Sequence, residues 1–218
     1  MGQKLSRRHF VHAITASAGA GVLAACGNKA APTSSNQTSS APRPVPPASQ
    51  PFSVSLPRET FLQYLDATAD TNMRRCHHCA QATFATLQDG FGLEGGAILK
   101  ALTPLPGIAE RGETCGAVVA SLMALGLMFG RDRIDDWPAW RASLGPAQAF
   151  CAAFKKEFGS TQCGDLHERL FGRRYNLADP AELREFQSAS PGPTELCGGV
   201  VRKAVRLAAE ILLEKRPA

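Results

Sequence analysis

The sequence lacks several patterns that would point directly to a fold or an activity. Alternating runs rich in Val, Ile and Thr, which are typical of β-strands, are missing. Beyond the N-terminal region, the longest apolar run covers residues 117–129, well short of the roughly 20 residues that cross a bilayer. No Ser-His-Asp arrangement, paired-carboxylate motif or phosphate-binding glycine loop occurs. A β-rich fold, a later transmembrane helix, and hydrolase or nucleotide-dependent chemistry therefore have no support.

Basic residues are also not arranged as they are in nucleic-acid-binding proteins. The formal net charge is +5, and part of it comes from Lys4, Arg7 and Arg8 at the N-terminus. The other basic residues are scattered, without interleaved aromatic residues or a recognisable nucleic-acid-binding motif. We therefore expect no nucleic-acid partner.

The N-terminus has the features of an export signal. Arg7 and Arg8 stand in a twin-arginine pattern ahead of a weakly apolar stretch rich in Ala and Gly. The sequence LAAC at residues 23–26 then resembles a bacterial lipobox, in which the cysteine is lipid-modified and becomes the first mature residue. We expect a signal peptide over residues 1–25, export by the twin-arginine route, and a lipid anchor at Cys26 on the periplasmic side of a bacterial membrane.

A tether separates this anchor from the folded part of the chain. Residues 26–57 are rich in Ser, Thr and Pro and have almost no bulky apolar side chain. Such a segment cannot bury enough surface to offset the entropy lost on ordering, so we predict that it is disordered. The remaining residues, 58–218, suit a single domain.

The spacing of apolar residues predicts that this domain is all-α, a single compact helical bundle of about six to eight helices. The expected helices cover residues 58–69, 72–90, 95–102, 114–129, 146–158, 161–171, 180–187 and 194–214. The helix at 114–129 is apolar nearly all round, which is typical of the central helix of a bundle.

The domain contains six cysteines: Cys76, Cys79, Cys115, Cys151, Cys163 and Cys197. The residues Cys115, Cys163 and Cys197 each follow a Ser or Thr within three positions, at the predicted opening of a helix. Unpaired backbone N–H groups there favour the thiolate, which is the form that binds metal or attacks disulfides. Cys79 falls in the second turn of its predicted helix, where this effect is weaker. Cys151 stands among Ala and Phe residues and is expected in the core.

Four segments resemble a known family, the small redox-active proteins named for their C, GCAxxG, C and C cysteine pattern. These segments are HCAQATFATL at Cys79, RGETCGAVVASLMALGLMFGR at Cys115, EFGSTQCGDL at Cys163, and the helix start at Cys197. The resemblance extends from about Phe61 to Leu213, although Ala120 replaces the last glycine of the central motif. It implies a helical fold and four functional cysteines, Cys79, Cys115, Cys163 and Cys197, without a defined reaction.

Three kinds of chemistry fit four such cysteines. Four thiolates are the usual ligands of an iron–sulfur cluster, and they also suit tetrahedral zinc. An exported chain with an even number of cysteines is also compatible with structural disulfides, as in a non-enzymatic binding module without a cofactor. Thiol–disulfide exchange is the third alternative. Because twin-arginine export carries folded proteins, we favour the iron–sulfur cluster and electron transfer with an unknown redox protein over a substrate-converting enzyme.

The segment Cys76-His77-His78-Cys79 offers auxiliary ligands or proton carriers. If both cysteines belong to one helix, they lie on the same face. Covalent c-type haem attachment requires His after the second cysteine, but residue 80 is Ala, so we expect no c-type haem. His167 lies one turn after Cys163, and we expect it at the surface.

Overall fold

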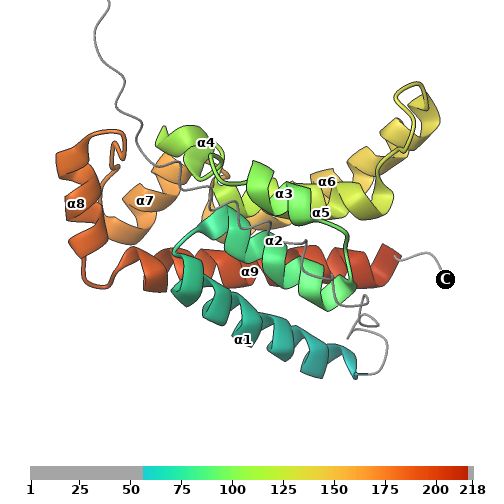
Figure 1. Cartoon of the computed structure of the whole chain (residues 1–218), viewed down its shortest axis with the longest axis horizontal. Helices are drawn as coiled ribbons and strands as arrows, with labels where there is room; N and C mark the ends of the chain where they lie inside the picture. Colours follow the sequence, from blue (N-terminus) through green and yellow to red (C-terminus); the bar gives the residue numbers. More distant parts are fainter. Residues whose placement is uncertain (1–55, 216–218) are drawn as a thin grey trace, which may run out of the picture. The chain divides into compact units, whose positions relative to one another are not determined.

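The regular secondary structure of residues 56–215, which the computed structural model describes, is entirely α-helical (Figure 1). The nine helices of this range are α1 (Arg58–Cys76), α2 (Cys79–Phe91), α3 (Gly96–Ala101), α4 (Gly107–Glu110), α5 (Gly116–Phe129), α6 (Trp137–Phe158), α7 (Cys163–Phe171), α8 (Pro180–Ser188) and α9 (Pro193–Lys215). The predicted all-α fold is confirmed. The eight longer helices correspond to the eight expected ones, and α4 is a four-residue turn that the sequence did not predict. The predicted signal peptide and most of the tether, with Arg7, Arg8 and Cys26, lie outside the described residues.

The core lies between α1, α2, α5, α6 and α9, with α5 in contact with α2, α6 and α9. The small residues Ala117, Ala120 and Ala124 of α5 have no exposed surface, which lets the neighbouring helices approach closely. Within residues 56–215, no helix is long and apolar enough to span a membrane.

The predicted break between the first two helices is wrong. We expected the first helix to end near Ala69 and the second to begin near Asn72. Instead, α1 continues to Cys76, because this continuation buries Met73 on the same face as Ala69. The chain then turns at His77, whose φ of 49° is left-handed, and α2 starts at Cys79. Cys79 is therefore the first residue of its helix and does not share a helix with Cys76.

The predicted start of α6 is also wrong. We expected this helix to begin at Pro146, but it begins nine residues earlier, at Trp137. Asp136 caps it by accepting a hydrogen bond of 2.9 Å from the Ala139 N–H, and Pro138 occupies the first turn, where its missing N–H costs nothing. Pro146 stands inside the helix and is buried. No residue of α6 before Pro146 is buried, so this first part extends beyond the core.

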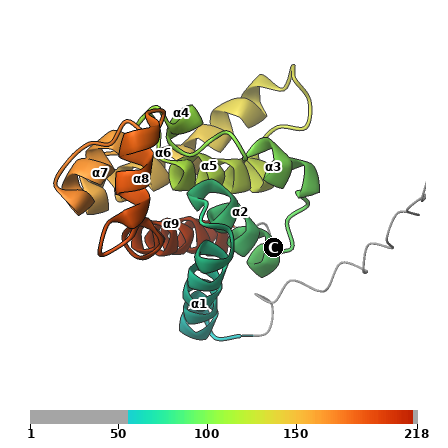
Figure 2. The same cartoon turned by 60° about the vertical axis from the view of Figure 1, so that its left-hand side comes forward.

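The two ends of the bundle carry different helix termini, because α1 runs in the opposite direction to α2, α5 and α9 (Figures 1 and 2). One end carries α7 and α8, together with the C-terminal end of α1 and the N-terminal ends of α2, α5 and α9. We call it the α7/α8 end. The far end carries the N-terminal end of α1, the C-terminal ends of α5 and α9, and the connection from α5 to α6 (Figure 1).

Candidate functional site

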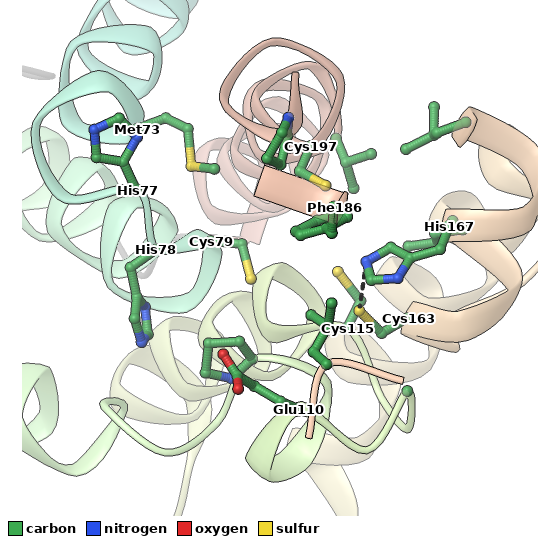
Figure 3. Close-up of a pocket in the computed structure, with 17 residues that line it drawn as sticks. Met73, His77, His78, Cys79, Glu110, Cys115, Cys163, His167, Phe186 and Cys197 are labelled. Carbon is green, nitrogen blue, oxygen red and sulfur yellow. Dashed lines mark hydrogen bonds between the residues drawn. The ribbon is translucent and has the colours of Figure 1, made fainter. Parts of the chain in front are cut away.

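The four cysteines singled out by the sequence line one cavity at the α7/α8 end. This cavity has a volume of about 140 Å³. Figure 3 shows Cys79, Cys115, Cys163 and Cys197 around the same hollow, each from a different part of the chain. All four are free thiols. Distant segments of the sequence therefore bring four unpaired sulfur atoms to one place.

The helix starts place these thiols, although not in the predicted manner. Cys79 and Cys163 are the first residues of α2 and α7, and Cys115 directly precedes α5. The expected caps Thr114 and Thr161 do not cap these helices, because Cys115 and Gln162 occupy the cap positions without side-chain bonds. Cys197 is the fifth residue of α9, so the helix-end effect expected for it is weaker, and the effect at Cys79 is stronger.

A backbone clamp holds Cys115 beside Cys163. The Cys115 N–H donates to the Thr161 carbonyl at 2.9 Å, and the Cys163 N–H donates to the Glu113 carbonyl at 2.6 Å. These bonds flank an antiparallel bridge between Thr114 and Gln162. The Cys163 N–H, which we expected to be unpaired, is thus used to position the two thiols. The clamp joins segments that the sequence analysis treated separately.

A left-handed turn forms another wall of the cavity. The four residues of α4, from Gly107 to Glu110, all have φ between 50° and 62°. Such values cost roughly 1–2 kcal/mol for each residue other than Gly, and Ile108 is β-branched. Gly107 has a second constraint, because a Cβ there would lie 3.3 Å from the Cys163 sulfur. The turn brings the Glu110 side chain to the cavity.

The hydrogen bond between Cys79 and Cys115 shifts the pKa values of these two thiols in opposite directions. It raises the pKa of Cys79, and burial and the charges of the other three cysteines raise it further. The same bond lowers the pKa of Cys115, against the effect of burial, and the backbone N–H groups of Ala117 and Val118 also favour its thiolate. Cys115 is therefore the thiol of this pair that ionises first.

The other two thiols resist ionisation. Burial, then the charges of Cys115, Cys197 and Glu110, raises the pKa of Cys163 well above its usual range. Burial, then the charge of Cys115, raises the pKa of Cys197 to about 12. None of the described residues that line the cavity is Lys or Arg. Four thiolates together would need a cationic group in the cavity to offset their repulsion.

A family model matches residues 77–211, and its description reads "Putative redox-active protein (C_GCAxxG_C_C)". The chain belongs to this family. The matched range starts at the turn between α1 and α2 and includes all four cysteines of the cavity. No curated protein and no solved structure matches the chain.

A buried histidine accompanies the cysteines of this C_GCAxxG_C_C protein. His167 is 3% exposed, so the prediction that it lies at the surface is wrong. Its Nε2 lies 3.5 Å from the Cys163 sulfur, and its Nδ1 is buried without a partner (Figure 3). Burial lowers the pKa of His167. The spacing from Cys163 was visible in the sequence, but the burial depends on rings brought in by later segments, such as Phe186 at 4.8 Å.

The remaining candidates divide between the cavity and its surroundings. His77 and His78 both line the cavity. The His77 Nδ1 is hydrogen-bonded to the Thr194 hydroxyl at 2.8 Å, and the His78 Nε2 is hydrogen-bonded to the Thr103 carbonyl at 2.9 Å. Cys76 is exposed and does not line the cavity. Cys151 packs against the core from α6. Glu110 and Phe186 also line the cavity, and no local pattern marked them in the sequence.

Proposed function

We propose that the cavity holds an iron–sulfur cluster and that the protein transfers single electrons to or from a redox protein partner. One observation carries this proposal: four unpaired thiols, from or directly before four different helices, line one largely apolar cavity. Four cysteine thiolates are the usual ligand set of [2Fe–2S] and [4Fe–4S] clusters. The ligands would be Cys79, Cys115, Cys163 and Cys197.

The electrostatics of the cavity support a cationic occupant. The hydrogen bond to Cys115 and burial raise the pKa of Cys79, and burial and then the neighbouring thiolate charges raise the pKa of Cys163 and Cys197. The described lining residues include no Lys or Arg. Bound iron would replace the thiol protons and offset the four negative charges. The cluster would supply the capacity to take up and release one electron.

The spread of the thiols favours a cluster over zinc. Within residues 56–215, no three His, Cys, Asp or Glu side chains are grouped so as to hold one metal ion. A tetrahedral zinc ion needs all its ligand atoms within about 2.0–2.3 Å of a single point. The four ligands of a cluster are divided among two or four irons and so need not meet at a single point, which suits four thiols distributed around a hollow.

The protein would tune such a site through its walls. Leu166, Leu170 and Val200 line the cavity and limit the access of water. The Ala117 N–H, which favours the Cys115 thiolate, and His167, whose Nε2 lies 3.5 Å from the Cys163 sulfur, could donate hydrogen bonds to cluster-bound sulfur. Burial and hydrogen bonds to sulfur are the main means by which proteins set cluster potentials.

The location of the protein belongs to the same proposal. The pattern at Arg7 and Arg8 supports export by the twin-arginine route, and the lipobox at Cys26 supports a lipid anchor on the periplasmic side of a bacterial membrane. A protein exported in the folded state would carry its cofactor with it.

The test is iron, sulfide and visible-absorbance analysis of protein purified anaerobically from an exporting host. We expect stoichiometric iron and acid-labile sulfide, and loss of both in a Cys163→Ala variant. Cys76→Ala provides the control, because Cys76 is exposed and does not line the cavity. A colourless, iron-free protein, obtained under conditions that preserve clusters, would contradict the proposal.

The Cys79–Cys115 hydrogen bond favours one second candidate, thiol–disulfide exchange. A thiol of lowered pKa beside a protonated one suits a nucleophile and a resolving cysteine. The Cys115 thiolate would attack the disulfide of an oxidised partner, and Cys79 would displace the partner's second thiolate after losing its proton. The two cysteines would form one disulfide and give up two electrons, which reduce the partner's disulfide to two thiols. In that case iron-free oxidised protein would lose two thiols, located at Cys79 and Cys115 by mass spectrometry of alkylated peptides.

A further inference from the structure

The connection between α5 and α6 concentrates the exposed apolar surface of the described residues. Only three large hydrophobic side chains in residues 56–215 are exposed: Leu127 (45%), Ile134 (86%) and Trp137 (62%). Leu127 lies near the end of α5, Ile134 in the connection, and Trp137 at the start of α6, so two of the three fall within residues 130–141. We define the tip as residues 130–141. Clustered exposure of this kind marks an interaction surface, whereas single exposed apolar residues are ordinary.

We propose that the tip inserts its aromatic and aliphatic side chains into the interfacial layer of a phospholipid bilayer. The first part of α6 has no buried residue before Pro146, and the segment projects from the bundle (Figure 1). Projection lets the tip enter the layer of lipid headgroups without removing contacts from the core.

The composition of the tip suits a bilayer interface. Trp137 and Trp140 pack edge to face, with ring centroids 5.4 Å apart. Arg131 lies over the Trp137 ring at 5.6 Å, and Arg141 over the Trp140 ring at 4.4 Å. Tryptophan favours the boundary between headgroups and acyl chains, because its ring is apolar and its N–H is polar. Arginine can keep its charge among the headgroups while its stem covers apolar surface.

The net charge of the tip determines whether its binding to a bilayer depends on anionic lipid. Three arginines and three aspartates balance one another: Arg131, Arg133, Arg141, Asp132, Asp135 and Asp136. Asp136 caps α6, and Arg133 pairs with Asp135 at 2.8 Å. Without excess positive charge, insertion must come from apolar burial, so we expect little dependence on anionic lipid.

The helix α1 begins on the side of the bundle away from α7 and α8, as the tip does, although the two lie at opposite edges of that side (Figures 1 and 2). Met73 and His77, near the C-terminal end of α1, line the cavity, whereas Arg58 begins α1 at the far end (Figure 1). The tether predicted from the sequence has about thirty residues between Cys26 and Leu56, and a disordered chain of that length has a mean span of about 30 Å. This step rests on the proposed lipid anchor, which would keep the tip near the bilayer and raise its effective concentration there.

Tryptophan fluorescence tests the proposal, because the only two tryptophans of the whole chain, Trp137 and Trp140, are in the tip. The full-length protein with Cys26→Ser, which cannot be acylated there, is mixed with phosphatidylcholine vesicles with and without phosphatidylglycerol. We expect a blue shift of the emission and quenching by brominated lipid, similar with both vesicle types. Ile134→Ser should weaken partitioning roughly tenfold, since the transfer of the exposed Ile side chain from water into the bilayer is lost. Asp132→Ser, in the same segment, should leave it nearly unchanged.

The outcomes separate this inference from the proposed redox function. Protein that co-sediments with vesicles while its tryptophan emission stays unshifted would overturn the inference, because another segment would then make the contact. Equal partitioning of the Ile134→Ser and Asp132→Ser variants would overturn it as well. Iron content and visible absorbance, measured on the same samples, should not respond to either substitution. A protein without iron whose tip still enters the bilayer would refute the cluster alone.

Discussion

Gly116 shows how a missing side chain makes room for the site. A Cβ at this position would lie 2.7 Å from the Cys79 sulfur and 3.0 Å from the Ala80 Cβ. Gly116→Ala should therefore push the starts of α2 and α5 apart and displace Cys79, at a cost of about 1–3 kcal/mol. We expect a lower urea midpoint and less bound iron per chain.

Gly126, on the same helix, provides the matched control. A Cβ there would meet nothing within 4 Å, and the residue is exposed. Gly126→Ala should raise the free energy of unfolding by about 0.5–1 kcal/mol, because Ala loses less conformational entropy in a helix. If both substitutions had the same effect on stability and iron, close packing at Gly116 would not be important for the site.

Some residues of the cavity could be predicted from the sequence and others could not. The four cysteines were predicted from their local setting and from the family pattern, and the structure places them around one cavity. Glu110 and His167 were not, because their positions depend on contacts outside their own segments. A left-handed turn brings Glu110 to the cavity, and rings from α8 and the preceding loop cover His167.

At the scale of elements, His78 links the start of α2 to the loop after α3. Its Nδ1 accepts a hydrogen bond of 3.1 Å from the Gln81 N–H, and its Nε2 bonds the Thr103 carbonyl at 2.9 Å. His78→Ala removes both bonds and should destabilise the protein by about 1–2 kcal/mol. His78→Asn keeps a capping oxygen and should lose less. Chemical denaturation of the two variants compares the costs, and equal losses would mean that the cap contributes nothing.

The helix boundaries show why elements are harder to predict than the fold class. The sequence DTN at residues 70–72 is typical of a helix start, yet Asn72 instead donates to the Thr86 hydroxyl at 3.0 Å within a continuous α1. Pro146 is typical of a first turn, yet Asp136 caps α6 earlier. In both places tertiary contacts and competing caps outweighed the local preference. The apolar periodicity, which reports burial directly, predicted the all-α class correctly.

At the scale of the whole molecule, the buried thiols should make stability depend on pH. In the reduced, metal-free protein, the pKa values of Cys79, Cys163 and Cys197 are raised above those of the unfolded chain. Their full contribution to the free energy of unfolding is therefore present below the ordinary thiol pKa. It is lost as pH rises toward their pKa values in the folded protein, which is about 12 for Cys197. Cys115 has the opposite sign, since its pKa is lowered. Three groups outweigh one, so stability should fall above about pH 9.

Urea unfolding at several pH values between about 8 and 11 measures this loss. Lysine and tyrosine side chains also titrate in this range, so the comparison with Cys197→Ser isolates the thiol. The variant should lose stability less steeply, by up to about 1.4 kcal/mol per pH unit. Parallel curves for the two proteins would show that Cys197 ionises equally easily in the folded and unfolded states.

The cavity and the tip lie at opposite ends of α5, which bears on the partners that the proposed electron transfer could use. α5 begins beside the cavity and ends at the tip, and its 14 residues extend about 20 Å. A molecule held to a membrane by its far end would present the cavity to the aqueous compartment, away from the lipid. A carrier dissolved in the bilayer, such as a quinone, would then remain out of contact with the four cysteines. If the proposed cluster and the proposed membrane contact are both present, the electron donor or acceptor is expected to be a water-soluble protein, or a membrane protein whose aqueous domain reaches the cavity.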